Sequence, residues 1–166
     1  GSHRGKLVKL MNDVYESSSL YCFEPNKSMN FSLKKIGKNV KVFNYAVGEK
    51  NGEQKILISK IDLTHTLSKI NENSLYLKIK NFIIRKSKEK VVYKKIKVVS
   101  LKNFCKTKKI KRIDFLKVDV EGYEYEVLKG AKDIIKNVRF IMLEVQKNDM
   151  YANYSKNKIE NFLKKN

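Results

Sequence analysis

The sequence is poor in the residues that build disulfide frameworks, metal centres and membrane spans. Its 166 residues include no tryptophan, one proline, seven glycines and two cysteines. Cys22 and Cys105 stand far apart in apolar runs, so we expect two buried free thiols, because no spacing supports a disulfide or a metal pair. No apolar run approaches the roughly 20 residues that span a bilayer. The two free thiols lead us to expect a cytoplasmic protein.

Catalytic motifs that depend on histidine or on glycine-rich loops are also missing. Beyond residue 3 the one histidine is His65, which we interpret as structural or solvated. The chain contains no P-loop, no zinc-ligand spacing, no Gly-x-Gly-x-x-Gly motif and no Ser/His/Asp or Cys/His arrangement. Its chemistry therefore has to come from other residues.

Positive charge is abundant and comes almost wholly from lysine. Lysine and arginine number 37 against 17 acidic residues, which gives a formal net charge of +20. One explanation is an anionic partner such as nucleic acid, an anionic glycan or a membrane surface. The other is a biased genome that fills solvated positions with lysine and asparagine. We favour the second, because arginine recognises phosphate better and occurs only at Arg4, Arg85, Arg112 and Arg139.

Apolar periodicity predicts one α/β domain over residues 4–166, while residues 1–3 (Gly-Ser-His) resemble the remnant of an expression tag. We expect helices at residues 7–15, 28–36, 101–107 (or a turn), 123–135 and 155–165. We expect strands at residues 19–23, 40–47, 54–58, 113–120 and 139–145, and a β-hairpin at residues 78–84 and 90–99. Strands that alternate with helices indicate a mainly parallel sheet with helices on both faces.

Three local signals place the ends of these elements. Gly37 is expected at the C′ position of the helix at 28–36, and Ser155 at the N-cap of the last helix. Asn51-Gly52 predicts a turn from which the strand at 54–58 returns. Residues 64–73 are expected to be a loop or a short helix.

Acidic residues stand where the predicted strands end, at the edge where ligands bind in open α/β sheets. They are Glu24, Asp119, Glu121 and Glu144. A carboxylate there can accept both hydroxyls of a ribose, whereas a single acid at such a place can also be a helix cap or part of a solvated loop.

The segment Asp119-Val120-Glu121-Gly122 is the sharpest of these elements. If the strand persists that far, Asp119 and Glu121 point to one face and converge. Two close carboxylates can split their pKa values and leave one as a base. They could also bind a divalent cation, but two ligands are too few for a metal site. The alternative is that Glu121 favours the positive end of the following helix.

Several of these segments resemble FkbM-type methyltransferases. Residues 113–124 (IDFLKVDVEGYE), followed by 127–131 (VLKGA), look like the signature of that family. Residues 23–26 (FEPN), 44–48 (NYAVG) and 142–145 (MLEV) resemble its other strand ends. Val99-Ser100-Leu101 resembles a further element, but Lys102 replaces the expected acid. The order agrees from about Arg4 to Phe162.

The resemblance implies a Rossmann-like class I fold that binds S-adenosylmethionine (SAM) and methylates oxygen, often a sugar hydroxyl of a glycan or natural product. It implies that Glu24 and Asn26 bind the cofactor at its ribose end. Ala46 and Val47 would lie near the adenine. Asp119 would lie near the methionine end or the acceptor, with Glu121 beside it, and either acid is the expected catalytic base.

The sequence departs from the family at the first strand and at the end. Only Arg4-Gly5 matches the last positions of the glycine-rich loop that cradles the cofactor, and the strand before it and the last two strands of the class are lacking. Losing that central strand would leave its two neighbours with unpaired backbone groups. Three explanations stay open: segments are omitted from the sequence, the chain is deliberately shortened, or a second copy lends a strand in a homodimer.

Two functions of other classes compete with the glycan O-methyltransferase. The lysine-rich middle of the chain allows a nucleic-acid binder or methyltransferase, although the sequence lacks the aromatic-rich basic strand that stacks bases. The lacking glycine loop allows a non-catalytic module on the same fold.

Overall fold

The computed structural model describes residues 2, 5–59, 65–83 and 91–166. The helices are α1 (Lys6–Val14), α2 (Lys27–Lys34), α3 (Leu75–Ile83), α4 (Leu101–Thr107), α5 (Glu124–Gly130) and α6 (Lys156–Lys165), with a 3-10 turn at Ile135–Asn137. The strands are β1 (Leu20–Phe23), β2 (Val40–Phe43), β3 (Ala46–Val47), β4 (Gly52–Ser59), β5 (His65–Thr66), β6 (Val91–Val99), β7 (Ile113–Val118) and β8 (Val138–Leu143). No described helix is long and apolar enough to cross a membrane.

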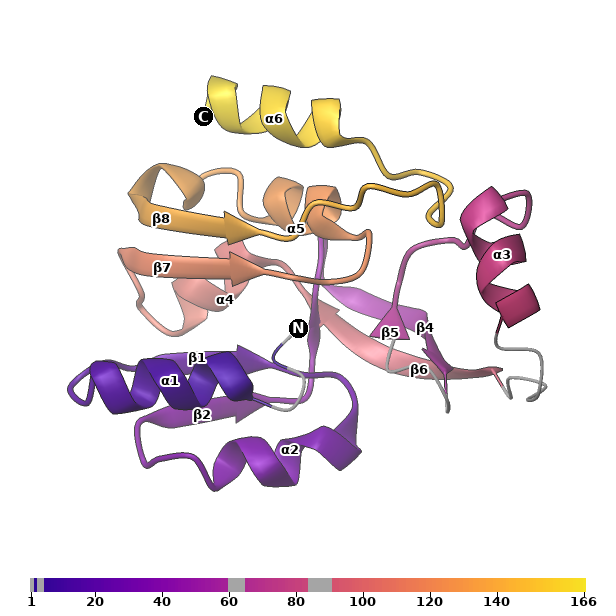
Figure 1. Cartoon of the computed structure of the whole chain (residues 1–166). Coiled ribbons are helices and arrows are strands. Elements are labelled where there is room, and N and C mark those ends of the chain that lie inside the picture. Colours follow the sequence, from indigo (N-terminus) through magenta and orange to yellow (C-terminus); the bar gives the residue numbers. More distant parts are fainter. Residues whose placement is uncertain (1, 3–4, 60–64, 84–90) are drawn as a thin grey trace.

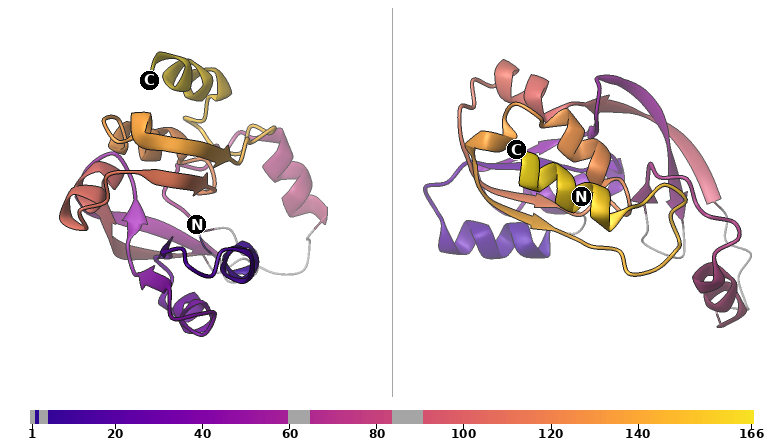
Figure 2. Two further views of the ribbon diagram at one scale, coloured as in Figure 1. Left: turned by 90° about the vertical axis from the view of Figure 1, so that its left-hand side faces the viewer. Right: turned by 90° about the horizontal axis from the view of Figure 1, so that it is seen from above.

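Two pairs of parallel strands form the centre of the molecule. β1 pairs with β2, and β7 pairs with β8, both in parallel register. Figure 1 shows all four strands pointing the same way, so their carboxyl ends face one side. Helices α1 and α4 lie on opposite sides of the β1–β2 pair (Figure 2). The predicted α/β fold with mostly parallel strands and helices on both faces is confirmed to this extent.

The strands do not form one sheet. Among the described strands, β1 has β2 as its one partner and β7 has β8, while β3, β6, β4 and β5 form a separate sheet in that order. The predicted single sheet is wrong for the described part of the chain.

The predicted strand at residues 40–47 is divided between two of these sheets. β2 ends at Phe43, where the Asn44 side chain donates hydrogen bonds to the carbonyls of Glu24 (2.8 Å) and Pro25 (3.3 Å). The chain then turns away, and Ala46 pairs with Val98 of β6. A side chain that binds the neighbouring loop thus stops the strand.

The strand after Asn51-Gly52 exists but has another partner than we expected. β4 runs antiparallel to β6 from Gly52 to Ser59, and β6 separates it from β3. The predicted return along the strand at 40–47 is therefore wrong. Residues 64–73, expected as loop or helix, include the two-residue strand β5, which pairs with β4.

The predicted hairpin at 78–84 and 90–99 is wrong in its first half, because the described part of that half is helical. The backbone N–H of Leu77 donates to the Ser74 hydroxyl at 3.1 Å, which caps helix α3. The Asp149 carboxylate accepts hydrogen bonds from the Ser74 hydroxyl (2.6 Å) and from the Leu75 N–H (3.1 Å). These caps favour a helix where the apolar residues by themselves suit a strand. Residues 84 and 90 lie outside the described residues.

Most of the other predicted helices are confirmed. The Ser155 hydroxyl accepts from the Lys158 N–H at 3.3 Å and caps α6, as predicted. Residues 101–107 are a helix, α4. α2, however, ends at Lys34, and Gly37 does not adopt the left-handed conformation that a C′ glycine uses. The helix expected at 123–135 ends at Gly130 and continues as turns.

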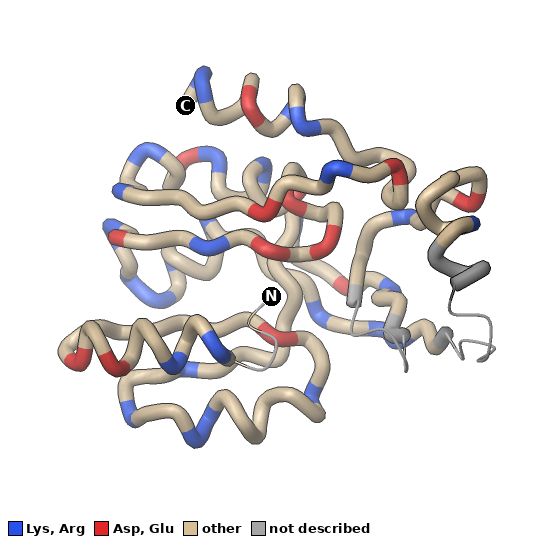
Figure 3. Tube along the Cα trace, in the orientation of Figure 1, with Lys and Arg blue, Asp and Glu red and all other residues tan. Residues whose placement is uncertain are grey.

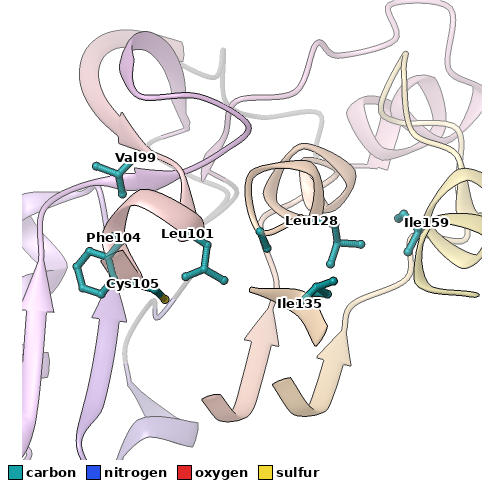
Figure 4. Close-up of a cluster of buried hydrophobic side chains, with 8 residues drawn as sticks. Val99, Leu101, Phe104, Cys105, Leu128, Ile135 and Ile159 are labelled. Carbon is teal, nitrogen blue, oxygen red and sulfur yellow. The ribbon is translucent and has the colours of Figure 1, made fainter. Parts of the chain in front are cut away.

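A core on the α4–α5 side joins the two parallel pairs. Its buried members come from β6, α4, α5, the following turns and α6 (Figure 4): Val99, Leu101, Phe104, Cys105, Leu128, Ala131, Ile135 and Ile159. The Phe104 ring meets those of Phe23 and Phe43 edge-on, with centroids 4.7 and 4.9 Å apart. Both cysteines are buried and free, as predicted.

Candidate active site

Two acids lie side by side where β7 and β8 end. Asp119 follows the last residue of β7, and Glu144 follows the last residue of β8. The Glu144 N–H donates to the carbonyl of Val118 at 3.0 Å, which carries the pairing of the two strands to this point. Figure 3 shows acidic residues gathered at these two strand ends. Parallel pairing therefore brings together acids that are distant in the sequence.

Glu121 completes a group of three carboxylates. One oxygen each of Asp119, Glu121 and Glu144 lies within 4.8 Å of the others. Sequence analysis expected Asp119 and Glu121 to converge along a continuing strand, but β7 ends at Val118. They meet because the chain turns: Glu121 has φ 54° and Gly122 has φ 86°, both in the left-handed region.

Asp119 and Glu144 titrate as a pair. Hydrogen bonding with Asp119, together with partial burial, raises the pKa of Glu144 to about 7. Burial by itself raises the pKa of Asp119, but hydrogen bonds with Glu144 and Lys117 outweigh it and hold that pKa below its ordinary value. Lys117 also forms an ion pair with Asp119. The pair thus separates into one ionised acid and one acid that changes its charge near neutral pH.

A buried glutamate, Glu124, stabilises the turn at Glu121 and Gly122 through hydrogen bonds to backbone amides. Glu124 is fully buried at the start of α5, and its Oε1 accepts the N–H groups of Val120 (3.1 Å) and Gly122 (3.3 Å). Burial raises the pKa of Glu124, although these backbone donors oppose the rise. We interpreted Glu121 alternatively as the acid of a helix N-terminus, but Glu124 and Glu126 occupy the first turn of α5.

Two polar side chains that we did not predict contact Glu121. The Tyr151 hydroxyl donates to Glu121 Oε2 at 2.7 Å, and the Thr66 hydroxyl donates to the Glu121 carbonyl at 2.6 Å. Both residues are buried. Thr66 ends the short strand β5, and Tyr151 lies in the segment between β8 and α6. No local pattern marks either of them.

The three carboxylates could also coordinate a divalent cation. Carboxylate oxygens are the ligands that Mg²⁺ and Ca²⁺ prefer, and Glu144 adds a third ligand to the two that we considered too few. Lys117 neutralises part of the charge of this group through its ion pair with Asp119.

The whole chain, including the segment that carries Asp119 and Glu121, matches a protein-family model. The model of the methyltransferase FkbM domain matches residues 1–166. The chain belongs to the FkbM methyltransferase family. Members of this family are SAM-dependent methyltransferases. The match also includes residues 1–3, which sequence analysis set aside.

One solved structure is similar to this FkbM domain. It is the methyltransferase FkbM from Methylobacillus flagellatus, with 16% identity, a TM-score of 0.47, and coverage of 81% of this chain and 28% of that chain. The domain thus spans less than a third of the length of that protein. No curated protein sequence matches the chain significantly.

The residues that family resemblance assigns to the ribose lie at the end of β1. Glu24 is 4% exposed, and its Oε1 accepts the N–H of Asn26 at 2.9 Å. Asn26 caps α2 by accepting the Ser28 N–H at 3.2 Å. A carboxylate can accept hydrogen bonds from several donors at once.

Gly5 lies at the start of α1 in the left-handed conformation, with φ 77°. A Cβ there would lie 2.7 Å from the ends of the Leu33 and Ile36 side chains, and together with the left-handed φ this close approach favours glycine. The Ser2 N–H donates to the carbonyl of Phe23 at 3.3 Å, which places this segment beside the end of β1.

The structure does not bring the side chains of Ala46 and Val47 into the carboxylate group. Ala46 is buried with Ile56, Ile96 and Val98 in the core of the sheet formed by β3, β6, β4 and β5. Val47 packs against the α4–α5 core. The side chain of His65, interpreted as structural or solvated, lies outside what the structure describes.

Proposed function

We propose that this FkbM domain transfers the methyl group of SAM to a hydroxyl group, with a sugar, glycan or related small molecule as acceptor. The observation that carries the proposal is the Asp119–Glu144 pair, whose pKa values lie on opposite sides of their ordinary values. Methylation of a hydroxyl releases a proton, and such a pair can take it near neutral pH. Four parallel strands that point one way support a Rossmann-like class I arrangement.

When bound, SAM supplies an electrophilic methyl group on a positively charged sulfur. In our proposal Glu24 holds the ribose hydroxyls, with Asn26 beside it and Gly5 at the start of α1. The side chains of Ala46 and Val47 are packed in the cores, so any contact with the adenine would have to come from their backbone.

The acids after β7 and β8 would act on the acceptor. Asp119 or Glu121 accepts a hydrogen bond from the acceptor hydroxyl and orients its oxygen. As the methyl carbon leaves the sulfur, which becomes neutral, and bonds to the acceptor oxygen, the hydroxyl proton would pass to the carboxylates. Glu144 could retain it because its pKa is about 7. The negative charge of the group also favours a cationic ligand.

Calorimetric titration with S-adenosylhomocysteine tests the cofactor site. We expect micromolar binding that is strongly weakened in Glu24→Gln, which keeps the size of the side chain but removes its charge. Glu53→Gln is the matched control, because Glu53 is exposed on β4 and pairs with Lys95. Folded wild-type protein that does not bind the ligand would contradict the proposal and favour a non-catalytic module.

Transfer of labelled methyl from SAM to a panel of hydroxylated acceptors tests the reaction. The product should resist mild alkali, as a methyl ether does and a methyl ester does not. Asp119→Asn should abolish transfer while the homocysteine analogue still binds. Label found only in alkali-labile product would exclude O-methylation of a hydroxyl.

Nucleic-acid binding is a second candidate, because a basic groove lies at the opposite ends of β7 and β8. Lys111, Arg112, Lys136 and Arg139 line it, and they include two of the four arginines of the chain. One acid, Asp114, pairs with Arg112 at 2.8 Å. Binding of a short RNA or DNA should weaken steeply with salt and be lost in Arg112→Gln/Arg139→Gln. A flat salt response would exclude this candidate.

A further inference from the structure

Glu121 has an unfavourable backbone conformation, which several hydrogen bonds stabilise. Its φ of 54° is in the left-handed region, which residues with a Cβ seldom adopt. The amides on either side of it, those of Val120 and Gly122, donate to Glu124, and its own carbonyl accepts from Thr66. A strained residue with this much support is a feature of functional sites.

The Glu121 side chain has its own support from Tyr151. Tyr151 is 4% exposed, and its hydroxyl lies 2.7 Å from Glu121 Oε2. Burial and this hydrogen bond both raise the pKa of Tyr151, so the hydroxyl stays protonated and remains a donor. Its ring lies against Gly122, where a Cβ would be 2.4 Å from the ring atoms.

The backbone of Tyr151 is fixed in turn by the segment that follows β5. Ile70 and Tyr151 form an antiparallel bridge. On either side of it the Asn71 N–H donates to the carbonyl of Met150 (2.8 Å), and the Ala152 N–H donates to that of Lys69 (2.9 Å). Backbone hydrogen bonds to residues 69–71 therefore fix the position of Tyr151 and of its hydroxyl group.

Electrostatic repulsion within the acidic group acts against the position of the Glu121 carboxylate. Its carboxylate lies within 4.8 Å of those of Asp119 and Glu144, and like charges at this distance repel. A side chain that is only partly buried can relieve this repulsion by turning toward water. The hydrogen bond from Tyr151 opposes that movement.

We propose that Tyr151 is a positioning residue that holds the Glu121 carboxylate beside Asp119 and Glu144, with Thr66 fixing the backbone of Glu121. The proposal rests on the proposed function, because it assigns this acidic group to the methyl-transfer centre. Tyr151 touches neither cofactor nor acceptor in this role and acts through Glu121.

The positioning role can be tested by comparing the binding of two ligands that differ in charge, without knowing the methyl acceptor. SAM carries a positive sulfur and S-adenosylhomocysteine a neutral one, so the ratio of their affinities reports how well the carboxylates face that sulfur. Tyr151→Phe keeps the ring against Gly122 and removes the hydroxyl. We expect it to reduce the preference for SAM by about threefold or more and to leave the homocysteine ligand within about twofold of wild type.

Tyr154→Phe is the matched control. The Tyr154 hydroxyl accepts the N–H of Gln146 at 3.0 Å and does not bond to the carboxylates, so its loss should leave the ratio unchanged. In a Glu121→Gln background Tyr151→Phe should change the ratio no further, because the group through which it acts is gone.

Two results separate the failure of this inference from the failure of the proposed function. Normal binding of both ligands with an unchanged ratio in Tyr151→Phe would overturn the positioning role and leave the cofactor site standing. Folded wild-type protein that binds neither ligand would overturn both. If Tyr151→Phe does not fold, Thr66→Val takes its place, since it removes the other hydroxyl donor to Glu121 and should also lower the ratio.

Discussion

Asp119 and Glu144 follow neighbouring parallel strands and are hydrogen-bonded to each other through their side chains. The pairing of Val118 with Leu143 sets this contact, because it brings the next residue of each strand to the same edge. The two acids therefore behave as one titrating unit, and changes at either one should appear at the other.

The first prediction concerns that titration. In protein labelled with ¹³C at the glutamate carboxyl carbons, Glu144 should titrate with a pKa of about 7. Asp119→Asn removes the charge that the Glu144 carboxylate faces, so the pKa of Glu144 should move down toward its ordinary value. Asp114→Asn, an exposed change on the same strand, should leave it in place. A Glu144 resonance that titrates in the ordinary range in wild type would contradict the pairing.

The stability of the fold should depend on pH through the same group. The folded pKa of Glu144 exceeds its ordinary value of 4.5, so the folded state binds the proton more tightly. Its stabilising effect is then complete at acid pH and is lost as pH rises to about 7. The buried Glu124 and the partly buried Glu126, whose pKa values burial also raises, act in the same direction.

Urea unfolding at several pH values measures this dependence. The free energy of unfolding of wild type should fall between pH 5 and pH 8, roughly the window between the two pKa values of Glu144. Glu144→Gln should show a shallower fall. Equal slopes for the two proteins would show that Glu144 is not the group responsible.

The turn at Gly122 should not tolerate a side chain. Gly122→Ala combines a left-handed conformation, φ 86°, with a Cβ placed 2.4 Å from the Tyr151 ring. The backbone alone should cost about 1–2 kcal/mol of unfolding free energy, and the displaced ring adds to it. A Tyr151→Ala background, which removes the ring, separates the two costs, because Gly122→Ala should cost less there than in wild type. Equal losses would argue against the ring contact.

Phe104 should be a major contributor to stability. It lies 7% exposed, and its ring is edge-on to three aromatic rings of β1 and β2: Tyr21, Phe23 and Phe43. Phe104→Ala should lower the unfolding free energy by about 3–5 kcal/mol. Phe31→Ala, at a side chain that is 68% exposed, should change it by no more than about 0.5 kcal/mol. A small loss at Phe104 would mean that α4 does not join the β1–β2 pair to the core.

The sequence predicted elements whose signals are local. Helix α6 begins after Ser155, and the cap and the apolar face that predict it lie within the same few residues. Strands β1, β7 and β8 were likewise visible as short apolar runs, and their ends marked Glu24, Asp119 and Glu144. The family signature is also local, since it follows one continuous segment.

Elements whose determinants lie far along the chain were predicted wrongly. Helix α3 was expected to be a strand, because the carboxylate that helps to cap it belongs to Asp149, 75 residues after Ser74. The strand at 40–47 is broken because Asn44 binds the carbonyl of Glu24, 20 residues before it. Local periodicity holds no information about such partners.

The sequence alone therefore determined the kinds of residue available, the strands that end in acids and the family. The tertiary structure decided which acids meet: Asp119 with Glu144 through parallel pairing, and Glu121 through a turn that Glu124 supports. It also supplied Tyr151 and Thr66, which carry no local signal, because their positions depend on backbone pairing with distant segments: Thr66 pairs with Leu57 of β4, and Tyr151 pairs with Ile70. Hydrogen bonds and charge repulsion act over a few ångströms in space, and only folding brings these groups within that range.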